Sequence, residues 1–434
     1  MVLGNEGVDL KLAELTNRKH RWMLWGTLAS LSAFPAMATD LYLPGFPAVA
    51  AQFGATTYDV QLTLSSFFYG MAIGQLVWGA ASDRLGRKLP TIFGIGLFIL
   101  GSIACAFAPN LWFLVIARFV QALGGAAAMT IVRAIVRDLF SGEEMARTMS
   151  AVMSIFMIAP ILAPSIGALI LEFGQWQWIF VVLALFGVGA ILNFVRMPET
   201  LPIEQRQRNG FGEVMKAYGT ILKTSEFRYA VVQAASASLM LFTYVSLIPS
   251  VLMVQFGATP AQFGIFFGIN SLALVAGSQI NRRILKKLKV SQALRNMVGF
   301  QAIMSIALFA LAHTVPSIWV VLPMLMLTIG ANPSIAGNSA TLAMGPFQNS
   351  AAQASAMVGL IQGISSASAA AIAAVLPGEP LSKMTIMMLV IAARVPVQNS
   401  AAAQGLNAVL LGVVLAVVTA GSGLLWSYGT SFAY

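Results

Sequence analysis

Long apolar runs recur along the whole chain, and they limit the folds that it can adopt. Several runs reach 18 residues or more, and a helix needs about 20 such residues to cross the hydrocarbon core of a bilayer. Only 9% of the 434 residues are charged, whereas soluble domains carry about 25%. The runs do not alternate between apolar and polar residues, as the strands of a membrane barrel would. The sequence therefore predicts an all-α membrane protein.

The positions of lysine and arginine predict the topology. Of the 25 Lys and Arg residues, 22 fall in five clusters, and the apolar runs between successive clusters come in pairs. All five clusters then lie on one side, which the positive-inside rule makes the cytoplasm. The net charge of +10 is explained by topology, and no nucleic-acid partner is expected. The clusters span Lys11–Arg21, Arg84–Lys88, Arg133–Arg147, Arg196–Arg228 and Arg282–Arg295.

The apolar runs divide into two sets of about six, which predicts two six-helix bundles and about 12 transmembrane helices. We expect a cytoplasmic N-terminus over 1–21, a first bundle over 22–195, a cytoplasmic linker over 196–228 and a second bundle over 229–434. The last span is left open between 384–395 and 406–426, and so is the side of the C-terminus. The other expected spans are 22–44, 60–82, 91–108, 111–132, 148–171, 176–195, 229–252, 262–280, 294–312, 318–342 and 353–376.

A weak internal repeat supports two related halves. Gly79–Arg84 follows the second predicted span, and Gly277–Arg282 follows the second span of the second half, with glycine, Asp or Asn, and arginine at matching offsets. Such duplication is typical of transporters that bind substrate near the bilayer midplane, between the halves.

Few residues in the chain are suited to metal binding or covalent catalysis. The only cysteine is Cys105, and the only histidines are His20 and His313. This set predicts no zinc site and no cysteine nucleophile. We therefore expect no enzyme activity, no metal and no cofactor other than a proton gradient.

Two charged residues lie inside apolar runs, and each is alone of its sign there. Asp40 interrupts the first run and Arg118 the fourth. A charge at that depth costs roughly 2.5–3.5 kcal/mol on insertion scales, so both are candidate proton-coupling residues. Two alternatives stay open: Asp40 as a wetted helix end, and Arg118 as a donor to backbone carbonyls. A direct ion pair, or coupling through water or Gln121, is also open.

The loop Gly79–Lys88 predicts a charged latch at the cytoplasmic end of the second span. A small residue at Gly79 would let two helices approach closely. Asp83 is placed to accept hydrogen bonds from Arg84, Arg87 or a neighbouring helix N-terminus, and Gly86 permits a tight turn. The alternative is a merely basic loop.

Prolines predict a kink in the fifth span. Pro160 and Pro164 cannot donate to the helix ladder, and Gly167 would allow close packing against the other half. Ordinary packing without gating is the alternative. Other polar, aromatic and methionine side chains in the spans are candidate substrate contacts, although most such side chains form helix–helix hydrogen bonds or face lipid. The candidates are Asp40, Tyr42, Phe68, Gln121, Met157, Gln233, Phe242, Tyr244, Asn270 and Asn332.

Three segments resemble motifs of the major facilitator superfamily. The Gly79–Lys88 loop is similar to its signature between the second and third helices. Arg118–Gly125 is similar to its R-x-x-Q-G pattern, with Ala122 where glycine is usual. Ala159–Gly167 resembles its antiporter motif G-P-x-x-G, with Ala163 in place of the first glycine.

Further segments resemble the Bcr/CflA drug-resistance branch of that family. They are Ala38–Pro44, Arg137–Asp138, which adds Asp138 to the latch, and Trp176–Phe180. The resemblance covers about 38–200 and fails past about 380. It implies a monomeric transporter of the bacterial inner membrane that exports amphipathic drugs, such as phenicols, bicyclomycin-like compounds or lipophilic cations, in exchange for protons.

The expected mechanism is alternating access. Asp40 would take up a proton from outside, and proton and drug would compete for one cavity. A proton-coupled importer of a metabolite or nutrient would have the same fold. A membrane enzyme or receptor is a third class, and the chain offers neither catalytic residues nor a sizeable soluble domain for it.

Overall fold

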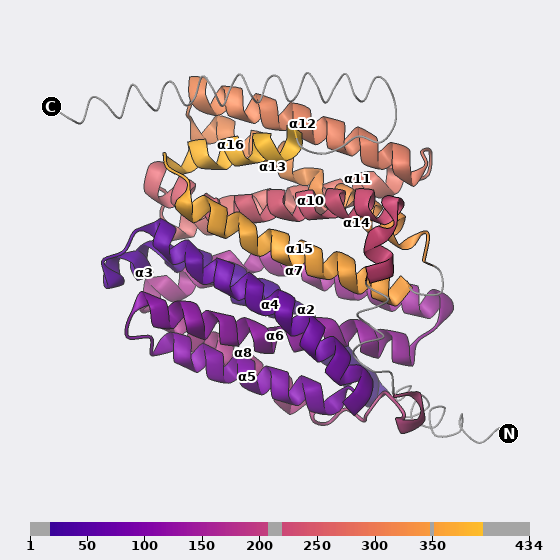
Figure 1. The fold of residues 1–434 in the computed structure, drawn as a ribbon. Coiled ribbons are helices and arrows are strands. Elements are labelled where there is room, and N and C mark those ends of the chain that lie inside the picture. The colour runs from indigo at the N-terminus through magenta and orange to yellow at the C-terminus, as the bar shows by residue number, and fades with distance from the viewer. Residues whose placement is uncertain (1–17, 207–218, 348–350, 394–434) are drawn as a thin grey trace. The chain divides into compact units, whose positions relative to one another are not determined.

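The computed structural model describes residues 18–206, 219–347 and 351–393, and in these ranges the chain is helical. It divides into two compact units. Unit 1 contains residues 1–210 together with Pro260–Gly268, and unit 2 contains Phe211–Thr259 together with 269–434. Within each unit the helices run side by side (Figure 1). The predicted domain boundaries at 21, 195 and 228 remain predictions.

Unit 1 contains six long helices and one short one among its described residues. The first predicted span, 22–44, ends early: its helix stops at Asp40, and a 3₁₀ turn, Leu43–Gly45, follows. Pro44 explains the early stop, because proline lacks the N–H that would donate to the Asp40 carbonyl oxygen in a continuing helix. The helices are α2 (Arg18–Asp40), α3 (Phe46–Phe53), α4 (Thr57–Leu85), α5 (Lys88–Ala106), α6 (Leu111–Leu139), α7 (Gly142–Phe173) and α8 (Gln177–Phe194).

Glycines let α4 and α6 approach closely. A Cβ atom added at Gly70 would lie 2.5 Å from the Phe119 carbonyl oxygen, and one at Gly74 would lie 2.7 Å from that of Leu123. The prediction that Gly79 serves this purpose was wrong. A Cβ there would lie 3.7 Å from its nearest neighbour, an ordinary contact.

Unit 2 contains the helices of the second half apart from Pro260–Gly268, which belongs to unit 1. The predicted tenth span is divided in two. Residues 318–342 were expected to form one helix, but α13 and α14 are separated at Ala331. Pro333 in the first turn of α14 accounts for the break, because it lacks the N–H that would donate to the Ile329 carbonyl oxygen and its ring crowds the preceding turn. The helices are α10 (Ser225–Pro249), α11 (Pro260–Ile284), α12 (Val290–Thr314), α13 (Ile318–Gly330), α14 (Asn332–Met344), α15 (Ala351–Val375) and α16 (Pro380–Ala393), with a π-helical turn at Ser250–Gln255.

The described residues include nine helices, some of them joined segments, that are long and apolar enough to cross a membrane. Two shorter apolar helices, Ile158–Phe173 and Pro380–Ala393, add to them. The second of these occupies most of the predicted 384–395 span, and the alternative at 406–426 lies outside the described residues.

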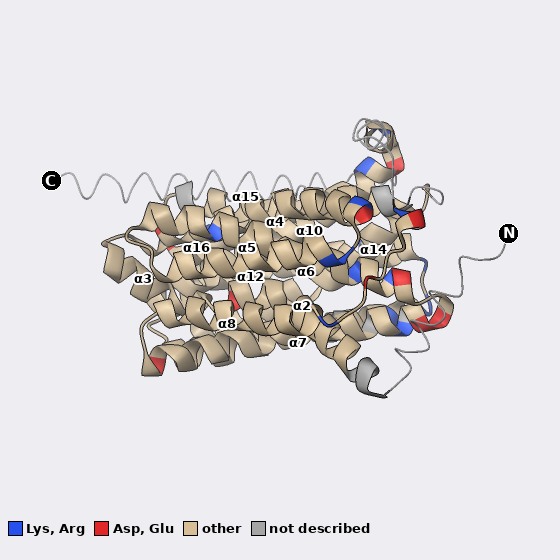
Figure 2. Cartoon of the chain, turned by 90° about the horizontal axis from the view of Figure 1, so that it is seen from below, with Lys and Arg blue, Asp and Glu red and all other residues tan. Residues whose placement is uncertain are grey.

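Within each unit, Figure 2 shows the charged residues mainly at one end of the helices. Arg84, Arg137 and the pair Arg282–Arg283 lie in the last turns of α4, α6 and α11. This placement agrees with the predicted topology. Lys383, in the first turn of α16, lies near the opposite end.

Candidate functional site

The turn after α2 places Asp40 and Tyr42 inside unit 1. Asp40 is 6% exposed and Tyr42 is fully buried. The Thr39 hydroxyl donates to Asp40 Oδ1 at 2.9 Å, and the Thr63 hydroxyl donates to the Tyr42 hydroxyl at 3.3 Å. The early end of α2 therefore leaves both the Asp40 carboxylate and the Tyr42 phenol buried, and Asp40 is not a wetted helix end.

Arg118 is fully buried on α6 and joins three helices of unit 1. Its Nη1 donates to the Ala38 carbonyl oxygen at 3.0 Å and to Gln121 Oε1 at 2.6 Å. Gln121 in turn donates to the Ser102 hydroxyl at 2.8 Å. Among the ion pairs of the described residues, none joins Asp40 to Arg118. Of the alternatives left open above, the structure has Arg118 bound to a carbonyl and to Gln121.

Aromatic rings surround the rest of the Arg118 guanidinium. Its Cζ lies 4.2 Å from the centroid of Phe67, 5.0 Å from that of Tyr42 and 5.7 Å from that of Phe180. Nε and Nη2 have no hydrogen-bond partner among the described residues. Cation–π attraction is stronger in desolvated sites and offsets part of the cost of burying this charge. The sequence analysis did not assign Phe180, Thr39, Thr63 or Ser102 a role in this site.

The remaining substrate candidates fall in both units. Phe68 is buried beside Phe67, with the two rings edge to face at 5.9 Å. Gln233 is buried and Phe242 is partly exposed, both on α10.

The structure brings two of the unit 2 candidates together, Tyr244 and Asn270. Asn270 Nδ2 donates to the Tyr244 hydroxyl at 3.2 Å. Asn332 instead accepts from Gln301 Nε2 at 2.7 Å. The side chain of Met157 lies outside the described part of the chain.

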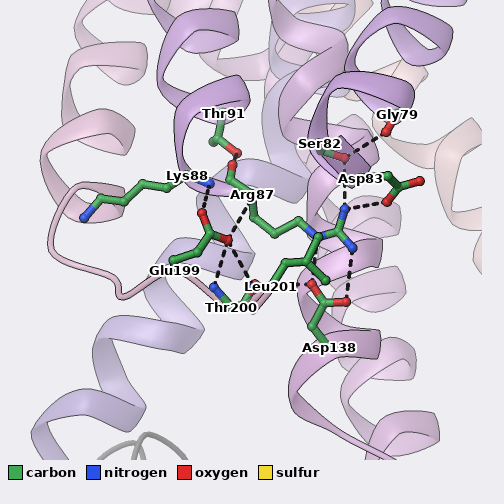
Figure 3. A network of polar contacts seen from close by, with 10 residues as sticks. All are labelled: Gly79, Ser82, Asp83, Arg87, Lys88, Thr91, Asp138, Glu199, Thr200 and Leu201. Atoms are coloured by element: carbon green, nitrogen blue, oxygen red, sulfur yellow. Dashed lines mark hydrogen bonds and ion pairs between the residues drawn. The ribbon is translucent and has the colours of Figure 1, made fainter. Parts of the chain in front are cut away.

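The predicted latch is present as a network around Arg87 (Figure 3). Arg87 Nη1 donates to Asp83 Oδ1 at 2.7 Å and to Ser82 Oγ at 3.1 Å. Arg87 is one of the three partners of Asp83 that the sequence left open. Nε and Nη2 bond the two carboxylate oxygens of Asp138 at 2.7 and 3.2 Å. Burial disfavours the charged form of Arg87. The hydrogen bonds and charges of Asp138 and Asp83 outweigh this effect and raise the pKa of Arg87 above its ordinary value. The alternative donor Arg84 is exposed.

The sequence analysis missed Glu199, which completes the latch. Its carboxylate accepts from the backbone N–H groups of Arg87 at 2.7 Å and Lys88 at 3.0 Å. The sequence feature that could have drawn attention to Glu199 is the Pro198–Pro202 segment, in which a proline at each end restricts the backbone. Nothing local indicates a partner that lies 112 residues away.

Helix α7 is continuous from Gly142 to Phe173, with Pro160 and Pro164 inside it. Gly167 does allow close packing, but against its own unit: an added Cβ would overlap the Leu41 carbonyl oxygen. The expectation that Gly167 itself makes the contact with the second half was wrong, because the turn after α2 occupies that position. The same helix does pack closely on a segment of the second half, since a Cβ added at Gly264 would lie 2.9 Å from the Ser165 Cα. The kink remains a prediction.

Comparisons with known proteins agree on one family. Residues 28–371 match the model described as Major Facilitator Superfamily. An uncharacterized MFS-type transporter of Bacillus subtilis, YdgK, is 35% identical over 79% of this chain and 86% of its own. A bicyclomycin resistance protein homolog of Haemophilus influenzae is 30% identical, over 80% of this chain and 88% of its own. The multidrug resistance protein MdtL of Shigella dysenteriae is 30% identical, over 58% of this chain and 62% of its own.

Solved structures agree on the fold. The nucleoside transporter NupG superposes with a TM-score of 0.69 at 13% identity, covering 91% of this chain and 99% of its own. The Escherichia coli xylose transporter XylE superposes with a TM-score of 0.66 at 12% sequence identity. The superposition covers 86% of this chain and 96% of the XylE chain. At such identity the likeness shows the fold alone, and it confirms the predicted helical transporter fold.

Proposed function

Because this chain belongs to the major facilitator superfamily, whose members are membrane transporters and not enzymes, we propose that it is a proton-coupled multidrug exporter of the bacterial inner membrane. Its substrates would be amphipathic drugs of the phenicol or bicyclomycin type and lipophilic cations. The names of two relatives, a bicyclomycin resistance homolog and a multidrug resistance protein, support this substrate class. We further propose that it works as a monomer, with its N-terminus in the cytoplasm.

The observation that carries the proposal is the buried carboxylate of Asp40 at the end of α2. A side chain that is 6% exposed in a membrane protein favours loss of charge, and taking up a proton removes it. Thr39 Oγ1 bonds to Asp40 Oδ1, and it can do so with either the ionised or the protonated group. Asp40 therefore has a local partner for both states of a transport cycle.

Arg118 provides a path by which protonation can change conformation. It binds the carbonyl of Ala38, two residues before Asp40 in the same helix end. A change of charge at Asp40 alters the forces on this turn, and Arg118 transmits that change to α6. If drug binding and proton binding favour different positions of the turn that follows α2, the two binding events are coupled.

The experiment is drug efflux from cells, with and without an uncoupler of the proton gradient. Bicyclomycin, chloramphenicol and a fluorescent lipophilic cation are loaded in parallel. Expression should lower the accumulation of at least one compound, and the uncoupler should restore it. Net uptake driven by the gradient would instead support a proton-coupled importer of the same fold.

Asp40→Asn tests the proposed proton site directly. The variant should retain the Thr39 contact and fold, yet export at below about a tenth of the wild-type rate, because an amide cannot carry the proton. Glu172→Gln is the matched control, since Glu172 lies exposed at the end of α7. Normal resistance in cells that carry Asp40→Asn would contradict the assignment.

A further inference from the structure

The start of the linker turns back onto the latch loop (Figure 3). Glu199 Oε1 accepts from the Arg87 N–H at 2.7 Å, and Oε2 accepts from the Lys88 N–H at 3.0 Å. Oε1 also accepts from the N–H groups of Thr200 and Leu201, at 3.0 and 3.1 Å. One carboxylate thus satisfies four backbone donors, two from the beginning of α5 and two from its own segment.

The beginning of α5 needs such a partner. Its N-cap residue is Arg87, whose side chain makes no capping bond because it points to Asp83 and Asp138. The first N–H groups of a helix have no partner within the helix and attract negative charge. Burial opposes the charge of Glu199, but its backbone hydrogen bonds prevail and hold the pKa below its ordinary value.

A second contact joins the same segment to the other side of the latch. The Thr200 hydroxyl donates to Asp138 Oδ2 at 3.3 Å, the oxygen that also receives Arg87 Nε. Gly86 leaves room for this arrangement. Its φ is +90°, and a Cβ there would lie 2.5 Å from Glu199 Oε2.

We propose that Glu199 is a positioning residue of the latch, which binds the start of the linker to the latch loop so that both move together. By holding the backbone of Arg87 it keeps the guanidinium between Asp83 and Asp138. When the latch opens during transport, the start of the linker moves with the latch loop in the same step. The transport part of this proposal rests on the proposed function, whereas the binding of linker to loop does not.

The first test is hydrogen–deuterium exchange of the Arg87 and Lys88 amides in the purified full chain. Glu199→Ala should speed their exchange about tenfold or more. Glu199→Gln should have a smaller effect, since its amide oxygen still accepts one N–H. Glu204→Ala is the control, because Glu204 is exposed five residues further on. Wild-type exchange in Glu199→Ala would overturn the proposal.

The second test separates positioning from simple stability. In reconstituted vesicles, Glu199→Gln should lower the maximal export rate several-fold and leave the KM for drug within about twofold, because the drug site is elsewhere. If exchange rises in both variants while their maximal rates equal that of wild type, the coupled movement is refuted. If wild type exports no drug, the proposed function fails, and the exchange experiment still decides whether Glu199 binds the loop.

Discussion

At the residue scale, Arg118 is a buried cation with no carboxylate in its ion-pairing range among the described residues. Its charge is compensated by one carbonyl, one amide oxygen and three aromatic rings. Only a planar guanidinium can donate in its plane and stack on rings with its faces. The site therefore selects arginine by shape as well as by charge.

We predict that Arg118→Lys, which preserves the charge, lowers export about tenfold or more. A lysine ammonium cannot donate to Ala38 and Gln121 while also stacking on Phe67. The variant should also be less stable by about 1–3 kcal/mol, because a buried acceptor loses its donor. Melting temperature and initial efflux rate on one preparation measure both effects.

Arg147→Lys is the matched control for that substitution. Arg147 is 77% exposed and pairs with Glu143 on the surface of α7, so a lysine there should behave as wild type. Wild-type export by Arg118→Lys would mean that charge alone, and not the planar contact, is what unit 1 requires.

At the element scale, the helices of each unit are held together by places where one backbone touches another. In unit 2 the tightest is Gly277 of α11. A Cβ there would overlap the carbonyl oxygen of Gly330, and the Ser334 hydroxyl donates to the Gly277 carbonyl at 3.1 Å. The contact brings α11 against the break between α13 and α14.

Gly277→Ala should therefore destabilise the protein by about 1–3 kcal/mol, since one methyl group has no space. Gly299→Ala on α12 is the control. An added Cβ at Gly299 meets nothing within 4 Å, and alanine is favoured over glycine in a helix by about 0.5–1 kcal/mol. Thermal unfolding in one detergent compares them. Equal melting temperatures would show that α11 can shift away from Gly330.

The latch should be insensitive to pH across the neutral range. The pKa of Glu199 lies below its ordinary value of 4.5, and that of Arg87 lies above its own. A depressed carboxyl pKa contributes stability above the unfolded value and loses it as the pH falls through the folded value. Because the intrinsic exchange rate of an amide varies with pH, each measured rate is divided by the intrinsic rate at the same pH. Corrected protection of the Arg87 and Lys88 amides should then be constant from about pH 6 to 8 and decline only in acid. A decline near neutral pH would contradict this.

At the scale of the whole molecule, the distribution of charge predicts which helix ends face the cytoplasm. The loops on either side of α12 offer a direct comparison. Lys286 belongs to a basic cluster before this helix, and Val315 follows its end. The positive-inside rule places the first in the cytoplasm and the second outside.

Single cysteines at these two positions test the orientation. Cys105, the natural cysteine, is buried and should react little with a membrane-impermeant maleimide. We expect Val315→Cys to be labelled in intact cells, and Lys286→Cys to be labelled only in everted vesicles. The opposite pattern would reverse the proposed topology.

Much of the architecture could be predicted because its signals are local. The apolar runs predicted the helices, and the sequence placed Asp83 within reach of Arg84, Arg87 or a helix N-terminus, of which Arg87 is its ion-pair partner. Pro333 was also a local signal for the division of the tenth span. The end of α2 at Asp40 was one of the alternatives left open, but Asp40 is buried there instead of wetted. Gly79 was misjudged because close approach depends on where two helices cross.

The partners of the functional side chains could not be predicted in the same way. Glu199 reaches the start of α5 across 112 residues, and Arg118 reaches Ala38 across 80. Which side chains meet over such separations depends on the rotation and depth of each helix, which many packing contacts determine together. The sequence by itself determined where helices form and which ends carry positive charge, because transfer from water to lipid acts on each segment separately. Only the tertiary structure decided which carbonyl, ring or amide each buried charge contacts.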